Sequence, residues 1–130
     1  MDAVRESGNE RVTVKDLRKW QQRLGLMDWH ITLHRNVPKE NMATDDSLAC
    51  CTYQEVLKNA RIQVKSVTDA NNDGHGVYGR KPDELQSVLH ELLELKFCLI
   101  RKDDDSTDDR IMHQIIDDIA RALAEAERSK

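Results

Sequence analysis

The stretch DELQSVLHELLELKFCLI, residues 83–100, decides the fold of this chain. Pro82 precedes it and two acidic residues open it, which suits the first turn of a helix. Its main apolar stripe has helical spacing and consists of Leu85, Val88, Leu89, Leu92, Leu95 and Leu99. Because Leu93 and Phe97 lie outside that stripe, we predict a helix over 83–100 that is buried on two sides, between a sheet and another helix.

An earlier helix and three strands are predicted before this central helix. Thr13 and Asp16 have the spacing of a capping box for a helix that ends near Gly25. Residues 29–34 alternate between apolar and polar side chains, as in a half-buried strand. Residues 48–53 and 60–67 are also predicted to be strands, and polar loops are expected at residues 36–46 and 71–80.

The chain is expected to end in a second long helix and to form one domain. Residues 108–128 show a helical stripe of Met112, Ile115, Ile116, Ile119, Leu123 and Ala126. The order is that of an α+β fold: an N-terminal helix, a small sheet of three to four strands and two C-terminal helices. Residues 1–12 are polar and are predicted to be a flexible N-terminus, and residues 13–128 a single domain.

The composition indicates which binding partners and which cellular compartment to expect. The 130 residues, 38% hydrophobic and 34% charged, carry a formal net charge of −4. That balance suits one domain with its own core and disfavours nucleic acid as a partner. No stretch resembles a signal peptide or a membrane span, so no membrane partner is expected. Three cysteines, two of them adjacent, make a poor disulfide framework, so we expect a cytoplasmic protein. Nothing in the sequence indicates the oligomeric state.

The central helix carries the sequence His90-Glu91-Leu92-Leu93-Glu94, which resembles the zinc-peptidase pattern H-E-x-x-H. Residues four apart leave the same face of a helix, so His90 and Glu94 are able to bind one metal ion. Glu91 lies a quarter-turn away, where that pattern places the general base. His113, at the edge of the apolar stripe of the last helix, is the candidate third ligand.

A solvated polar face is the alternative for His90 and Glu94, and at this point both interpretations stay open. His30 and His34 also have spacing compatible with a metal, but we interpret them as surface histidines because no third ligand accompanies them. Trp20 and Trp29 are interpreted as core residues.

Four stretches together resemble a known family. They are LGLMDW (residues 24–29), the segment Tyr53 to Val64, VLHELLEL (residues 88–95) and the segment His113 to Leu123. Their order, over roughly residues 13–125, is similar to that of the small zinc metallopeptidase-like proteins of phages and bacterial mobile elements. These are the minimal gluzincins of the H-E-x-x-H…E type. The resemblance implies a zincin-like domain and a zinc cofactor.

The ligand types are exchanged relative to that family. The family has His where this chain has Glu94, and Glu where this chain has His113. The resemblance therefore implies a zinc site of His90, Glu94 and His113 in the order H-E-x-x-E…H, which favours metal binding over the polar face.

The activity implied is hydrolysis of peptide bonds in a peptide or protein substrate, with Glu91 activating the attacking water. The alternative is a catalytically inactive metal-binding or protein-binding module on the same scaffold. Tyr78 and His75, in the loop before the central helix, are candidate donors to the transition state. Asp109 and Asp117 flank His113 by four residues on each side and are candidates to accept a hydrogen bond from its imidazole.

Overall fold

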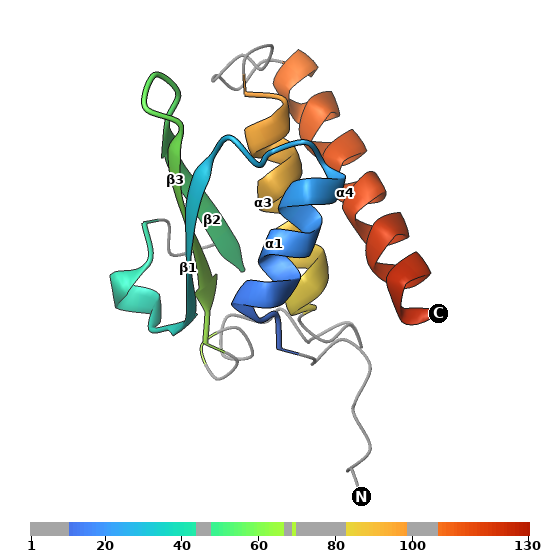
Figure 1. Ribbon diagram of the computed structural model, residues 1–130, viewed down its shortest axis with the longest axis horizontal. Coiled ribbons are helices and arrows are strands. Elements are labelled where there is room, and N and C mark those ends of the chain that lie inside the picture. Colours follow the sequence, from blue (N-terminus) through green and yellow to red (C-terminus); the bar gives the residue numbers. More distant parts are fainter. Residues whose placement is uncertain (1–10, 44–47, 67–68, 70–82, 99–106) are drawn as a thin grey trace, which may run out of the picture.

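The computed structural model describes residues 11–43, 48–66, 69, 83–98 and 107–130. The elements in chain order are α1 (Val14–Arg23), β1 (His30–Val37), the 3₁₀ turn η1 (Lys39–Asn41), β2 (Ala49–Gln54), β3 (Asn59–Lys65), α3 (Glu84–Lys96) and α4 (Thr107–Arg128). This is the predicted α+β class (Figure 1). The central helix α3 packs against β2 and β3 on one side and against α4 on the other.

The sheet has the strand order β1-β3-β2. β2 and β3 form an antiparallel hairpin, and β1 runs parallel to β3. All three predicted strands are confirmed with shifted ends. β1 continues to Val37, three residues past the predicted end, because Val37 pairs with Lys65 after an irregularity that begins at His34. The loop predicted from residue 36 therefore starts later, and it contains η1.

The start of α1 follows the predicted capping box. The Thr13 side chain accepts a hydrogen bond from the backbone N–H of Asp16, and the Asp16 carboxylate accepts one from the backbone N–H of Thr13. Gly25 ends the helix with φ +72°, a conformation that L side chains rarely adopt. Val12, expected in the flexible N-terminus, is 3% exposed, and its N–H donates to Glu84. Residues 1–10 lie outside the described part.

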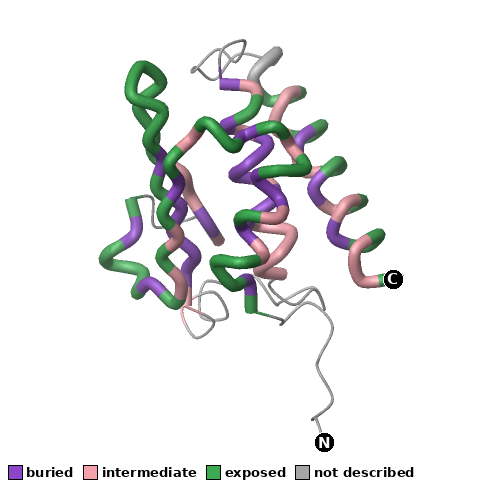
Figure 2. The backbone as a smooth tube through the Cα atoms, viewed as in Figure 1, coloured by how far each residue is buried: buried purple, intermediate pink, exposed green. Residues whose placement is uncertain are grey.

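The predicted burial of α3 on two sides is confirmed, and Figure 2 shows the buried turns along this helix. Its buried residues are Val88, Leu89, Glu91, Leu92, Leu93 and Leu95. The helix begins after Asp83, whose side chain caps the N–H of Gln86. It ends at Lys96, short of the predicted residue 100, because Phe97 leaves helical geometry and its N–H caps the last turn. Residues 99 and 100 are not among those described.

α4 has the predicted length, and its predicted stripe is confirmed in part, because Met112, Ile116 and Leu123 belong to the core or pack against it. Ile116, Ala120 and Ala124 are fully buried, whereas Ile115 and Ile119, both assigned to the stripe, are 49% and 37% exposed. The reason is that the buried arc of α4 is narrow and contains alanines, which let α3 approach closely. The prediction followed the largest side chains instead of the helical phase. No helix in the described segments is both long and apolar enough to span a bilayer.

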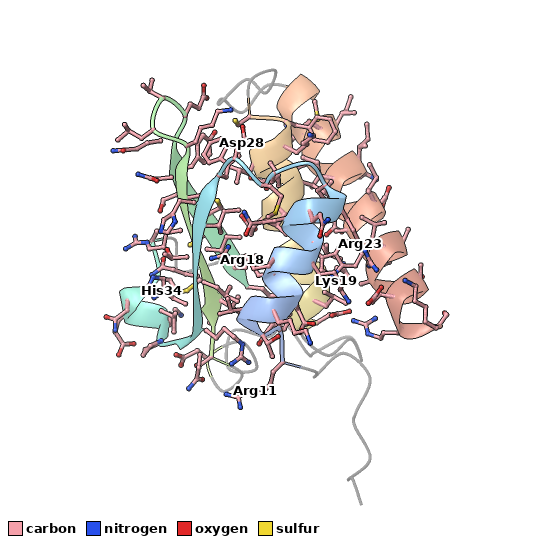
Figure 3. The ribbon with its side chains drawn as sticks, in the orientation of Figure 1. Arg11, Arg18, Lys19, Arg23, Asp28 and His34 are labelled. Atoms are coloured by element: carbon pink, nitrogen blue, oxygen red, sulfur yellow. The ribbon has the colours of Figure 1, made fainter. Side chains whose placement is uncertain are left out.

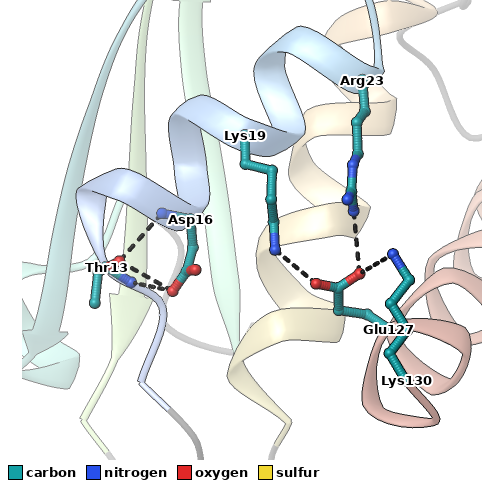
Figure 4. Close-up of polar contacts among 6 residues, drawn as sticks. All are labelled: Thr13, Asp16, Lys19, Arg23, Glu127 and Lys130. Atoms are coloured by element: carbon teal, nitrogen blue, oxygen red, sulfur yellow. Dashed lines mark hydrogen bonds and ion pairs between the residues drawn. The ribbon is translucent and has the colours of Figure 1, made fainter.

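Glu127, in the last turn of α4, ties that helix to α1 (Figure 4). Its carboxylate oxygens lie 2.6 Å from Lys19 Nζ and 3.0 Å from Arg23 Nη1. Lys130 Nζ lies 3.4 Å away. The hydrogen bonds from Lys19 and Arg23 lower the pKa of Glu127 from 4.5 to about 2. The ionised carboxylate therefore stabilises the packing of α1 beside α4.

We expect Glu127→Gln to lower the free energy of unfolding at pH 7 by about 0.5–1 kcal/mol, as for a solvent-screened network. The folded-state pKa is depressed, so the stabilisation is present above about pH 4.5 and is lost as the pH falls toward 2. Urea titrations at pH 7 and pH 2.5 should therefore show a difference between wild type and variant that shrinks with acidification. Glu125→Gln, an exposed change on the same helix, is the control and should have no such pH-dependent effect.

Candidate metal centre

His90 and Glu94 leave the same face of α3, as their spacing predicts. The Nε2 atom of His90 lies 2.7 Å from a carboxylate oxygen of Glu94. Their side chains are only 20% and 14% exposed, because this face of the helix is directed toward α4 and not into solvent. The interpretation of these residues as a solvated outer face is therefore wrong.

His113 reaches the same place from α4. Its Nδ1 atom lies 3.1 Å from the Glu94 oxygen that also contacts His90. The two imidazole rings stack with their centroids 6.0 Å apart and an interplanar angle of 17°. One ligand atom from each of His90, Glu94 and His113 lies within 4.8 Å of the other two. The three residues predicted to share an ion are thus brought together.

This group has the dimensions and the chemistry of a metal site. An ion with tetrahedral bonds of about 2.0–2.2 Å holds its ligand atoms about 3.3–3.6 Å apart. To admit an ion, the 2.7 Å contact needs to lengthen by about 0.6–0.9 Å and the 3.1 Å contact by about 0.2–0.5 Å. Two imidazoles and one carboxylate also form one of the ligand sets of catalytic zinc. The residues therefore fit a divalent metal ion.

The charges around His90 favour a cation at this position. Burial alone lowers the pKa of His90. The hydrogen bond to Glu94 and the negative charges of Glu91, Glu94 and Asp117 outweigh burial and raise the pKa above 6.5. Glu91 is only 8% exposed, so its charge is poorly screened by water. A site that stabilises a protonated imidazole in this way also stabilises a metal cation that replaces the proton.

Asp117 contacts a different histidine from the one predicted. Its carboxylate lies 3.5 Å from Nδ1 of His90, the ring nitrogen that does not contact Glu94. Arg121 holds the other Asp117 oxygen at 3.2 Å. Histidine ligands commonly give their second nitrogen to a carboxylate, which fixes the ring and strengthens the ligand. The Asp117 carboxylate is therefore placed to orient the imidazole of His90, whereas the sequence predicted this contact for His113.

Cys51 is a neighbour of the site that the sequence analysis missed. It pairs with Ile62, which is fully buried, and packs against the core on the side of the sheet that faces the helices. Burial raises the pKa of the Cys51 thiol, and the charges of Glu91 and Glu94 raise it further. The thiol is therefore neutral and lies beside the carboxylates without belonging to the three-residue group. The position of Cys51 could have been predicted from the alternation of residues 48–53, because that alternation places Cys51 on the inner face with Ala49.

The remaining candidates divide into three groups. His30 and His34 are exposed, as predicted for surface histidines. Trp20 is buried and Trp29 packs against the core, as predicted. His75, Tyr78 and the side chain of Asp109 lie outside what the structure describes.

No protein-family model, curated protein or solved structure matches the chain. The resemblance to the minimal gluzincins thus stays a prediction.

Substitutions in this group should change metal affinity in a graded order. Glu94→Gln removes a ligand and should cost the most zinc affinity, about 100-fold or more. Asp117→Asn removes the carboxylate beside His90 and should cost about tenfold. Asp118→Asn, an exposed acid on the same helix, is the matched control and should leave affinity unchanged within about twofold. Competition titrations against a chromophoric chelator measure all three. Equal effects of the Asp117 and Asp118 changes would rule out the orienting role.

Proposed function

We propose that this chain is a zinc-dependent metallopeptidase in which His90, Glu94 and His113 hold the metal and Glu91 is the general base. One observation carries the proposal: ligand atoms of His90, Glu94 and His113 lie within 4.8 Å of one another. These residues come from two helices, and 19 positions of sequence separate Glu94 from His113. Ordinary helix packing does not require two histidines and a glutamate at one point between two helices. Zinc bound there would supply Lewis acidity toward a substrate carbonyl and toward the attacking water.

Glu91 supports the catalytic part of the proposal. It is a buried carboxylate that follows a ligand directly in the chain, and it is not a member of the three-residue group. Its charge acts on both His90 and Cys51, so it lies close to the site. In the proposed reaction, Glu91 takes a proton from water as the oxygen attacks the peptide carbonyl. It then gives that proton to the leaving amine.

The proposed substrate is a peptide in extended conformation. β2 is an edge strand among the strands that the structure describes, and α3 packs against it. The unpaired backbone groups of such an edge are able to hydrogen-bond an added strand. The three free cysteines suit the cytoplasmic location expected from the sequence. A catalytically inactive metal-binding module is the second candidate, because the same three ligands serve a metal that performs no chemistry.

Glu91→Gln separates the two candidates. The variant should keep one zinc per chain, because Glu91 is assigned as base and not as ligand. Its cleavage of an unstructured protein such as casein should fall by about 10²–10⁴-fold. Metal content by elemental analysis and a cleavage assay with zinc-loaded protein give the two readouts. Loss of zinc in this variant would contradict the ligand assignment. Zinc-loaded wild type that cleaves no peptide would leave the inactive module.

A second test exchanges the two ligand types. Glu94→His with His113→Glu restores the order found in the gluzincin family and keeps two imidazoles and one carboxylate. The double variant should bind zinc within about tenfold of wild type. Each single change alters the ligand set and should cost more than the double change does. Residues that serve one ion are expected to show such non-additivity, by about 0.5 kcal/mol or more. Additive losses in the cycle would mean that the two residues do not share an ion.

A further inference from the structure

The three strands contain no acidic residue, although the protein as a whole is acidic. The chain has 24 Asp and Glu residues against 20 Lys and Arg, yet none of the acids lies in β1, β2 or β3. The outer face of the sheet carries His34 and Arg61, since their neighbours Leu33 and Ile62 belong to the core on the inner face. Figure 3 shows His34 on the side of β1 that faces away from α1. This face lies across the sheet from the metal centre.

A hollow of about 460 Å³ opens on this outer face, at the end of β1. Its lining includes His34, Asn36, Asn41 and Arg61, and none of the nine described residues that line it is acidic. Within the part of the chain that the structure describes, no hydrogen bond or ion pair engages these four side chains. Arg35 also lines the hollow, but its guanidinium forms an ion pair with the Glu84 carboxylate, with Nη2 and Oε1 2.8 Å apart. Among the described residues of the hollow, Arg61 is therefore the arginine whose guanidinium has no acidic partner.

Two features of the backbone shape the hollow. Gln63, only 7% exposed, holds the segment that follows Pro38 against the outer face. Its amide donates to the carbonyl of Asn41 at 3.0 Å and accepts from the N–H of Ala43 at 2.9 Å. The pairing of β1 with β3 is irregular between His34 and Val37, and Asn36 has φ +57°. Asn36 lies within this irregular stretch and lines the hollow.

We propose that this hollow binds an oxyanion, the phosphate or carboxylate group of a small molecule. Arg61 offers several N–H donors in a planar fork that matches two oxygens of such a group. Asn36, Asn41 and His34 add further N–H donors around it. The volume lies within the range of small-molecule sites. The site lies on the opposite face from the metal centre, so this proposal does not depend on the proposed peptidase activity.

The test is an anion titration followed by ¹H–¹⁵N NMR, on protein that has been freed of metal with a chelator and then exchanged into chelator-free buffer. Inorganic phosphate, acetate and chloride are added separately at matched ionic strength to wild type, Arg61→Gln and Lys15→Gln. Lys15 is an exposed cation on α1, so its change removes the same charge at a distance from the hollow. The unperturbed remainder of each spectrum reports that the variant is folded.

Phosphate or acetate should shift the amide signals of residues 34–41 and 61 to saturation, and chloride should not. Tighter binding of phosphate identifies a phosphate site, and tighter binding of acetate identifies a carboxylate site. Arg61→Gln should raise the dissociation constant at least about tenfold, because a charged hydrogen-bond donor is lost. Lys15→Gln should change it by less than about twofold. Equal shifts with chloride, or unchanged binding in Arg61→Gln, would overturn the proposal.

Discussion

The Glu94 carboxylate, shared between two imidazoles, is the interaction on which the α3–α4 pair depends. Its oxygen contacts His90 on its own helix and His113 on the next, and its side chain is only 14% exposed. A carboxylate buried to this degree is costly unless charged or hydrogen-bonding partners surround it. The packing that brings α4 onto α3 therefore also requires a hydrogen-bond donor or a cation at this point, which the two imidazoles or a metal ion would supply.

The position of α3 explains why His90 and Glu94 are largely shielded from solvent and why a side chain of α4 contacts them. One side of the helix packs against β2 and β3, and the other packs against α4. Fully buried leucines such as Leu89 and Leu92 fix the helix in the core, while the small Ala120 and Ala124 let α4 lie close. Close approach of two backbones is what allows a short side chain such as Glu94 to reach His113. The apolar packing and the polar group are thus parts of one arrangement.

Much of this could be predicted from the sequence, because it depends on local spacing. The capping box at Thr13, the alternation in β1 and the shared face of His90 and Glu94 follow from the periods of helix and strand. The buried stripe of α4 was predicted from side-chain size, so Ile115 and Ile119 were wrongly predicted to be buried. His113 was correctly predicted to point toward α3. The pairing of β1 with β3 and the contact of Asp117 with His90 depend on how separate elements meet. Spacing along the chain does not contain that information.

The claim that His90, Glu94 and His113 bind one metal ion is tested most directly by a crystal structure of the zinc-loaded protein, with anomalous data collected at the zinc edge. We predict one strong peak about 2.0–2.2 Å from an imidazole nitrogen of His90, an imidazole nitrogen of His113 and a carboxylate oxygen of Glu94. Asp117 should remain beside the second nitrogen of His90. A peak elsewhere, or none between α3 and α4 while His90 still bonds directly to Glu94, would contradict the claim.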